Sequence, residues 1–173
     1  MNAITHLTQN NIRNSVDTAS FRDAMSLLAS AVTIITTDGP NGRHGFTASA
    51  VSSVSDTPPT ILVCVNRTSS SHAHLFAHGR LAVNILSDSH DTLSGRFATS
   101  RLSMDERFSE GDWKRGAGGL PVLGDALASL ECRIADIAEV GTHTVIFGEV
   151  ETINLQPGSG KALVWFRRQY AAL

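Results

Sequence analysis

The sequence predicts a mainly β protein with a few short helices, folded as an antiparallel barrel. Many short β-branched segments are separated by turn residues, helical segments are few, and no alternation of strand and helix signals a parallel sheet. At 173 residues the chain is long enough for one domain with one core. We expect a mobile N-terminal segment, residues 1–16, followed by a single domain, residues 17–173.

The first expected element is an amphipathic helix. Phe21, Met25 and Leu28 recur at helical spacing, and either Asp17 or Ser20 is suited to cap the N-terminus.

A β-hairpin should follow this helix. Residues 32–37 are mostly β-branched, residues 38–42 read DGPNG and favour a turn, and residues 43–51 continue in extended form. A Pro-Pro pair then favours an extended approach to residues 60–65, which are too short and too β-branched for a helix.

The middle of the chain alternates between short helices and strands. Residues 71–78 are expected to form a helix ending at Gly79, residues 81–86 a strand, and residues 88–98 a second helical segment. Residues 101–121 contain four glycines and are expected to form a long irregular loop. These glycines do not stand between a strand and a helix, so they are no dinucleotide fingerprint.

Three further strands complete the predicted barrel. They cover residues 127–138, 142–154 and 162–166, and a turn containing Gly141 joins the first two.

Composition excludes several classes of partner. A net charge of −2, from 14 basic and 16 acidic residues, provides no field for nucleic acid. No run approaches the ~18 apolar residues of a membrane helix, and the N-terminus lacks a secretory signal pattern. Cys64 and Cys132 stand apart in strand-like surroundings, as expected of buried thiols in a reducing compartment. We expect a cytoplasmic protein with no membrane and no nucleic-acid partner.

Two hydroxyl-rich segments flank the apolar residues 61–65. Residues 47–55 carry five Ser/Thr among small and apolar residues, which suits close backbone approach to a flat polar ligand. Residues 66–72 carry Arg67, four Ser/Thr and a histidine, which suits a phosphate. A planar heterocycle joined to a phosphate is the outline of a flavin nucleotide. The first segment could equally be only a Thr/Ser-rich strand.

The second segment also has two interpretations. Asn66, Ser69, Ser71 and His72 could form only a polar loop with a helix N-cap, but the free N–H groups of such a helix also suit an anion. We assign this loop to the flavin phosphate.

Several phrases of the sequence resemble those of a known family, the small flavin reductases that serve two-component flavin monooxygenases, of the hydroxyphenylacetate-monooxygenase reductase type. These phrases are FRDAMSLLASAVTIITTDGPNGRHGFTASAVSSVSDTPPTILVCVNR, LAVNIL, MDERF, LASLECRI and GTH. The resemblance implies a flavin-binding, antiparallel Greek-key split β-barrel, a homodimer with flavin near the subunit interface, and a monooxygenase component as partner.

The resemblance also implies roles for individual residues. In related reductases the TAS segment contacts the isoalloxazine ring, largely through its backbone, and the SVS segment helps to hold the ribityl chain. The residues that take these roles are Thr47, Ala48, Ser49, Ser53, Val54 and Ser55. Independently, Arg96 and Phe97 offer a cation and a ring to the flavin tail, although Phe97 could equally belong to the core.

His143 is the candidate catalytic residue. A lone histidine at a strand start is more often structural, but in related reductases a histidine in a Gly-Asp-His or Gly-Thr-His setting faces the nicotinamide. This chain has Thr142 before it and lacks the adjacent acid. We expect His143 to orient the pyridine nucleotide rather than to act as an obligatory acid.

No metal site is expected. Of His72, His74 and His78 only the last two share a helix face, and no nearby Cys, Asp or Glu completes a tetrahedral set. The nucleophile elbow of hydrolases and the P-loop are also missing.

The resulting hypothesis is an NAD(P)H-dependent flavin reductase. It would transfer a hydride from NADH, with NADPH as a second candidate donor, to FAD or FMN and supply reduced flavin to a separate monooxygenase. Such a reaction needs no protein nucleophile. The alternatives are a non-catalytic flavin-binding or flavin-carrier protein of the same fold and, less compatible with the hydroxyl-rich loops, a barrel for an apolar ligand.

Overall fold

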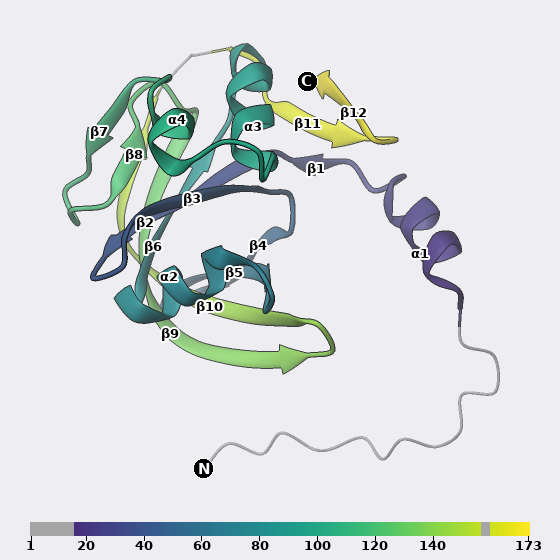
Figure 1. The fold of residues 1–173 in the computed structure, drawn as a ribbon, viewed down its shortest axis with the longest axis horizontal. Coiled ribbons are helices and arrows are strands. Elements are labelled where there is room, and N and C mark those ends of the chain that lie inside the picture. Colours follow the sequence, from purple (N-terminus) through teal and green to yellow (C-terminus); the bar gives the residue numbers. More distant parts are fainter. Residues whose placement is uncertain (1–15, 157–159) are drawn as a thin grey trace.

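The computed structural model describes residues 16–156 and 160–173 and is dominated by antiparallel β-sheet (Figure 1). The predicted mainly β fold with short helices is therefore confirmed. The expected mobile segment, residues 1–16, lies outside the described residues apart from Val16.

Seven strands form the main sheet, in the order β3-β2-β6-β9-β10-β5-β4. Their bounds are β2 Thr33–Gly39, β3 Gly42–Ala48, β4 Val51–Asp56, β5 Pro59–Asn66, β6 Arg80–Ile85, β9 Ala128–Val140 and β10 His143–Leu155. The strands β3 and β4 follow each other in the chain but lie at opposite edges of the sheet, so the barrel stays open between them. The predicted extended segment 43–51 is thus wrong in one respect, because the strand ends at Ala48 and a new one begins at Val51.

The strand β2 lies between two apolar clusters, which explains its nearly unbroken β-branched sequence. Ile35 packs inside the barrel with Val63 and Ile146, whereas Ile34 packs on the outer face with Phe97 and other core residues. Successive side chains of a strand point to opposite faces, so a strand covered on both faces is apolar at consecutive positions.

Short helices cover the sheet. The helix α2 (Ser70–His78) places Leu75 in the barrel core and ends at Gly79, whose φ of 71° is the left-handed cap expected for glycine. The 3₁₀ helix η1 (Asp88–His90) and the helix α3 (Asp91–Ala98) account for the second predicted helical segment.

The glycine-rich segment is more ordered than predicted. It contains α4 (Met104–Phe108), β7 (Trp113–Arg115) and the first residue of β8 (Pro121–Leu123), so the expectation of a wholly irregular loop is wrong.

A buried carboxylate organises the glycines of this segment. Glu131, only 2% exposed, accepts hydrogen bonds from the backbone N–H groups of Gly118 (3.0 Å) and Leu120 (3.1 Å). A Cβ atom at Gly116 would lie 2.3 Å from a carboxylate oxygen of Glu131. A larger residue at position 116 would therefore displace the Glu131 carboxylate from its backbone donors.

An arm extends from the barrel and ends in the N-terminal helix (Figure 1). It consists of the helix α1 (Thr18–Met25) and a three-stranded sheet. The strands of this sheet are β1 (Ser30–Ala31), β11 (Leu163–Phe166) and β12 (Gln169–Ala172), in that order. Asp17 caps α1 as predicted, by accepting from the backbone N–H of Ser20 (2.9 Å). No residue of α1 is buried.

The tip of the β11–β12 hairpin is fastened to α1. Arg167 and Arg168 both adopt positive φ angles, 49° and 61°, in a turn where Asn and Gly are usual. The backbone N–H of Arg167 donates to the carbonyl of Ser26 (2.7 Å), and the Arg168 guanidinium pairs with Asp23. These contacts hold the turn against the helix.

The thiols differ in their surroundings. Cys132 is buried, and burial raises the pKa of its thiol to about 12, whereas Cys64 is only half-buried, contrary to expectation.

Within the described ranges, no helix is long and apolar enough to cross a membrane.

Candidate functional site

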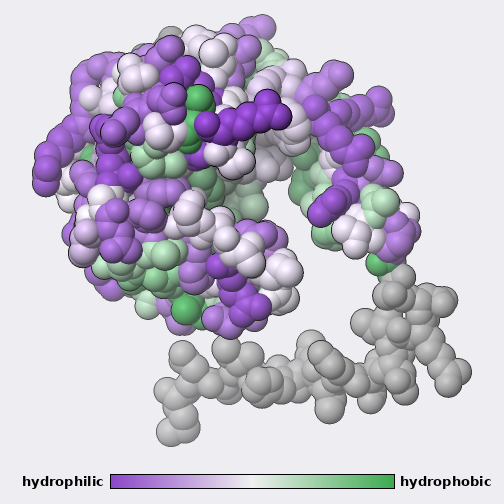
Figure 2. Space-filling view, in the orientation of Figure 1, coloured by the Kyte–Doolittle hydropathy of each residue, from purple (hydrophilic) through white to green (hydrophobic). Residues whose placement is uncertain are grey.

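A continuous groove follows the gap between β3 and β4. Three adjoining hollows of about 220, 550 and 280 Å³ form it. Ser49 lines the first and the second, and Val51 and Ser52 line the second and the third. The groove therefore follows, as far as Ser53, the hydroxyl-rich segment that the sequence singled out, whereas Val54 and Ser55 line none of the three hollows. On the face shown in Figure 2, a hollow separates the barrel from α1.

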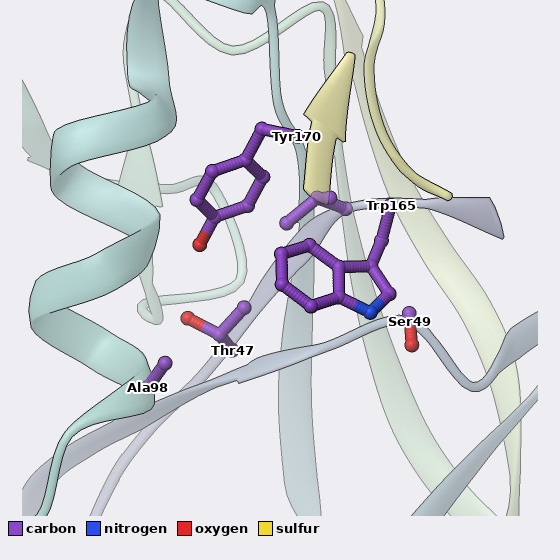
Figure 3. Close-up of a pocket in the computed structure, with 6 residues that line it drawn as sticks. Thr47, Ser49, Ala98, Trp165 and Tyr170 are labelled. Carbon is purple, nitrogen blue, oxygen red and sulfur yellow. The ribbon is translucent and has the colours of Figure 1, made fainter. Parts of the chain in front are cut away.

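The first hollow, which we call the aromatic pocket, is lined by Val32, Thr47, Ser49, Ala98, Trp165 and Tyr170 (Figure 3). The rings of Trp165 and Tyr170 meet edge to face at 5.0 Å between centroids. The Tyr170 hydroxyl shares a hydrogen bond with Ser94 of α3 (3.0 Å), which fixes the hairpin over the pocket.

Sequence reasoning missed Ala98, Trp165 and Tyr170. Trp165 and Tyr170 stand one position outside Phe166 and Gln169, which flank a two-residue turn, and this spacing is a sequence signal that pairs the two rings across a hairpin. No sequence signal brought the hairpin to Thr47, because that contact depends on the long-range pairing of β1 with β11.

The corner that ends β3 offers backbone and one free hydroxyl to the groove. The Thr47 hydroxyl donates to the carbonyl of Ser94 (2.6 Å), and the Thr33 hydroxyl donates to the carbonyl of Ala48 (2.7 Å). Ser49 is exposed, and within the described structure its hydroxyl has no hydrogen-bond partner. Because β3 and β4 are sheet edges, part of their backbone faces the groove rather than a neighbouring strand, although the carbonyls of Gly45, Ala48 and Ala50 already accept from protein donors.

Ser53, Val54 and Ser55 lie farther along β4. Val54 is 48% exposed at a register shift, and the Ser55 hydroxyl donates to the carbonyl of Thr57 (3.1 Å). Ser55 pairs with Thr60 at one end of β5, and Asn66 stands at the other end, about 20 Å away at about 3.3 Å per residue. Only a long ligand could reach both Ser55 and the loop at residues 66–72.

The predicted phosphate loop is held by its own hydrogen bonds. Asn66 Oδ1 accepts from the backbone N–H and the hydroxyl of Thr68 (both 2.9 Å), and the Ser69 hydroxyl donates to the Asn66 carbonyl (2.9 Å). Ser71 is 5% exposed, and the His72 imidazole shares a hydrogen bond with buried Thr144 (3.1 Å). The His72 backbone N–H donates to the carbonyl of Ser69 (3.2 Å), so of these two residues only Ser71 offers a backbone N–H to an anion at the start of α2.

His143 lies beside this loop. It is exposed, its Nδ1 shares a hydrogen bond with the Thr142 hydroxyl (2.9 Å), and it is the register partner of Asn66. The backbone N–H of Cys64 donates to the carbonyl of Ala50 (3.1 Å), which joins this end of β5 to the corner between β3 and β4. The structure thus brings His143, the loop and that corner to one end of the barrel.

Arg96 and Phe97 lie in α3, and both side chains interact with other residues of the protein. The Arg96 guanidinium donates to the carbonyl of Glu106 (2.5 Å) and pairs with Glu110 (3.4 Å). Phe97 is 2% exposed and packs against Phe108, at 4.9 Å between ring centroids. The core alternative therefore describes the Phe97 ring in this structure.

The helical histidines have protein partners rather than a common ligand. His74 bonds the carbonyl of Ser70 (2.9 Å), and His78 bonds the Thr37 hydroxyl (2.9 Å). In the described part of the chain, no group of three or more His, Cys, Asp or Glu is placed to hold a metal ion.

A buried histidine supports the base of α2. His44 of β3 is 4% exposed, stacks on His74 with ring centroids 4.3 Å apart, and shares a hydrogen bond with the Ser70 hydroxyl (3.1 Å). Burial, together with the neighbouring His74 and Arg107, lowers the pKa of His44 to about 4. The imidazole therefore stays neutral where α2 meets β3.

Comparison with known proteins gives concordant matches. Residues 25–173 match the family described as Flavin reductase like domain. Over 159 residues the chain is 52% identical to FMN reductase (NADH) RutF 1 of Methylorubrum extorquens strain PA1, covering 92% of this chain and 78% of that protein.

Two solved structures extend this comparison. BorF, the flavin reductase component of a bacterial two-component tryptophan halogenase, is 31% identical with a TM-score of 0.84, covering 91% of this chain and 98% of that chain. SgcE6 of Streptomyces globisporus C-1027, an NADH:FAD oxidoreductase in complex with NAD and FAD fragments, is 31% identical with a TM-score of 0.83, covering 90% and 92%.

The His44 environment predicts a loss of stability in mild acid. Below pH 6.5 the unfolded chain protonates this histidine, while the folded protein does so only near pH 4. The free energy of unfolding should therefore fall between these pH values, by up to about 3 kcal/mol. Urea unfolding across this range should give a shallower pH slope for His44→Gln than for the wild type. Equal pH slopes for His44→Gln and the wild type would contradict the conclusion that buried His44 causes this loss of stability.

Proposed function

The chain belongs to the flavin reductase-like domain family, and from this premise we propose that it is an NADH-dependent reductase of FMN that delivers reduced flavin to a separate oxygenase. The observation that carries the proposal is the groove along the open edges of β3 and β4, with His143 and the start of α2 at one end. The relatives named FMN reductase (NADH) support the choice of FMN and NADH.

The residues of the groove fit a flavin. Small side chains at Ala48 and Ser49 permit close backbone approach by a planar ring, and a strand edge presents backbone donors and acceptors of the kind that the ring's polar atoms require. The aromatic pair Trp165 and Tyr170 supplies apolar surface that excludes water. The start of α2 offers N–H groups to a phosphate.

The flavin and nicotinamide rings themselves supply the hydride-transfer chemistry. The protein's part is to align the two rings and to shield them. His143 is placed to orient the nicotinamide, because it is exposed at the strand end beside Asn66. Its neighbour Thr142 occupies its Nδ1 and leaves Nε2 for a ligand.

Delivery to an oxygenase agrees with an open site. The groove is a surface feature along two strand edges, so reduced flavin can leave without unfolding any element. BorF is described as one component of a two-component system. By analogy, we propose a flavin-dependent oxygenase as the partner of this chain.

The arm supports a homodimer. Phe21 and Leu28 are 58% and 60% exposed, and Met25 and Leu28 line the 550 Å³ hollow opposite Ala50 and Val51. An amphipathic helix with no buried residue normally gains its stability from a partner surface. We propose that a second copy of the chain covers this face, which would place the flavin groove beside the interface.

The proposed activity predicts NADH oxidation that depends on added flavin. Purified protein mixed with NADH should show falling NADH absorbance only when FMN, FAD or riboflavin is added, with FMN the most efficient. Flavin binding without turnover, with either NADH or NADPH, would favour the carrier alternative. Absence of flavin binding would contradict the proposal as a whole.

His143→Ala should separate nicotinamide use from flavin binding. Loss of an orienting hydrogen bond is expected to raise the KM for NADH about tenfold, while the Kd for FMN stays within about twofold because the residue lies outside the ring wall. Thr142→Val, which removes the partner of Nδ1, should produce a smaller effect of the same kind. Equal losses of NADH use and FMN affinity would refute this role.

Charges on the exposed apolar residues of the arm should dissociate the homodimer. Phe21→Glu in α1 with Leu28→Glu, three residues past the end of α1, places two carboxylates on this apolar surface, whereas Arg22→Glu changes the charge of a residue that is already polar. Light scattering should report a dimer for the wild type and the control and a monomer for the double variant. A monomeric wild type would contradict the proposed assembly.

A further inference from the structure

Arg107 is a buried cation whose partners are backbone carbonyls. Its side chain rises from α4, and the residue is 8% exposed. The guanidinium donates to the carbonyls of Gly45 (3.2 Å), Phe97 (3.5 Å), Thr99 (2.5 Å) and Leu102 (3.2 Å). Among the ion pairs of the described residues, none involves Arg107.

These carbonyls belong to the two walls of the aromatic pocket. Phe97 and Thr99 flank Ala98, which lines the pocket from the end of α3. Gly45 stands two residues before Thr47, which lines the pocket from β3. One side chain therefore links the two walls of the pocket without lining the pocket itself.

The two walls are also unusually close at this point. A Cβ atom at Gly45 would lie 2.7 Å from the Phe97 ring, so only glycine allows the observed approach of β3 to α3. The Thr47 hydroxyl adds a direct bond to the carbonyl of Ser94 in α3. The separation of the walls is thus set by Gly45, Thr47 and the Arg107 guanidinium together.

We propose that Arg107 is a positioning residue for the flavin ring, and this inference rests on the proposed flavin reductase function. Its guanidinium holds β3 against the end of α3 and so fixes the Thr47–Ser49 wall. Burying a cation is costly, and an apolar side chain of similar volume often gives equal or greater stability. A planar group with donors directed to several carbonyls is required where several segments must keep one mutual position.

The position of Arg107 distinguishes the ring wall from the phosphate loop. The carbonyls that it binds lie in β3, α3 and the connection to α4, and none belongs to residues 66–72. Disturbing Arg107 should therefore weaken FMN and riboflavin equally, because riboflavin has the same ring and ribityl chain but no phosphate.

The test compares four proteins: wild type, Arg107→Lys, Gly45→Ala and Glu131→Gln. Lysine keeps the charge but cannot reach all four carbonyls, and alanine at Gly45 forces β3 from Phe97, and with it the carbonyl that Arg107 binds, while the arginine itself is kept. Glu131→Gln is the matched control, because it also weakens a buried charged group bound to backbone, but its partners Gly118 and Leu120 do not line the groove. Thermal unfolding measures the stability that each variant loses.

Flavin titrations of the four proteins decide the matter. We expect Arg107→Lys and Gly45→Ala to raise the Kd of FMN and of riboflavin by the same factor, about fivefold or more. Glu131→Gln should leave both Kd values within about twofold of wild type despite a similar loss of Tm. Unchanged riboflavin affinity in Arg107→Lys, or equal weakening by Glu131→Gln, would overturn the proposal. A wild type that binds neither flavin would instead contradict the proposed function and, with it, this inference.

Discussion

The failure of β3 to pair with β4 is the constraint on which the site depends. A barrel that closed between these strands would satisfy their edge groups with each other, and no backbone would remain for a ligand. The corner at residues 49–50 separates them, because Val51 pairs with Val63 of β5 on the far side of the opening. The groove is therefore a consequence of sheet topology, and the small and hydroxyl-bearing residues along it make the opening suitable for a polar ring.

Much of the fold could be predicted from local pattern. The capped helix at Asp17, the hairpin around the DGPNG turn and the glycine that ends α2 each depend on residues within one turn or one strand pair. The glycine-rich segment could not be predicted in this way. Its shape depends on Glu131, which is more than ten residues distant and whose burial no local pattern signals.

The candidate site shows the same division between local and distant causes. The sequence identified Thr47 and Ser49, which line the aromatic pocket, because their composition suits a ligand. It could not place Trp165 and Tyr170 opposite them, since β11 reaches β1 only through a long-range pairing. The sequence also could not decide whether Phe97 contacts a ligand or belongs to the core, because core and ligand surfaces both favour aromatic residues.

Within the described residues, a chain of contacts connects α1 to the aromatic pocket through the arm. Asp23 holds the Arg168 turn, the turn belongs to the hairpin that carries Trp165 and Tyr170, and Tyr170 is bonded to Ser94. A displacement of α1 would therefore be transmitted to the pocket. By thermodynamic reciprocity, a ligand in the pocket would change the free energy with which a partner binds α1. If the proposed homodimer forms on α1, ligand binding and dimerisation are linked equilibria, and the apparent affinity of the pocket would vary with protein concentration.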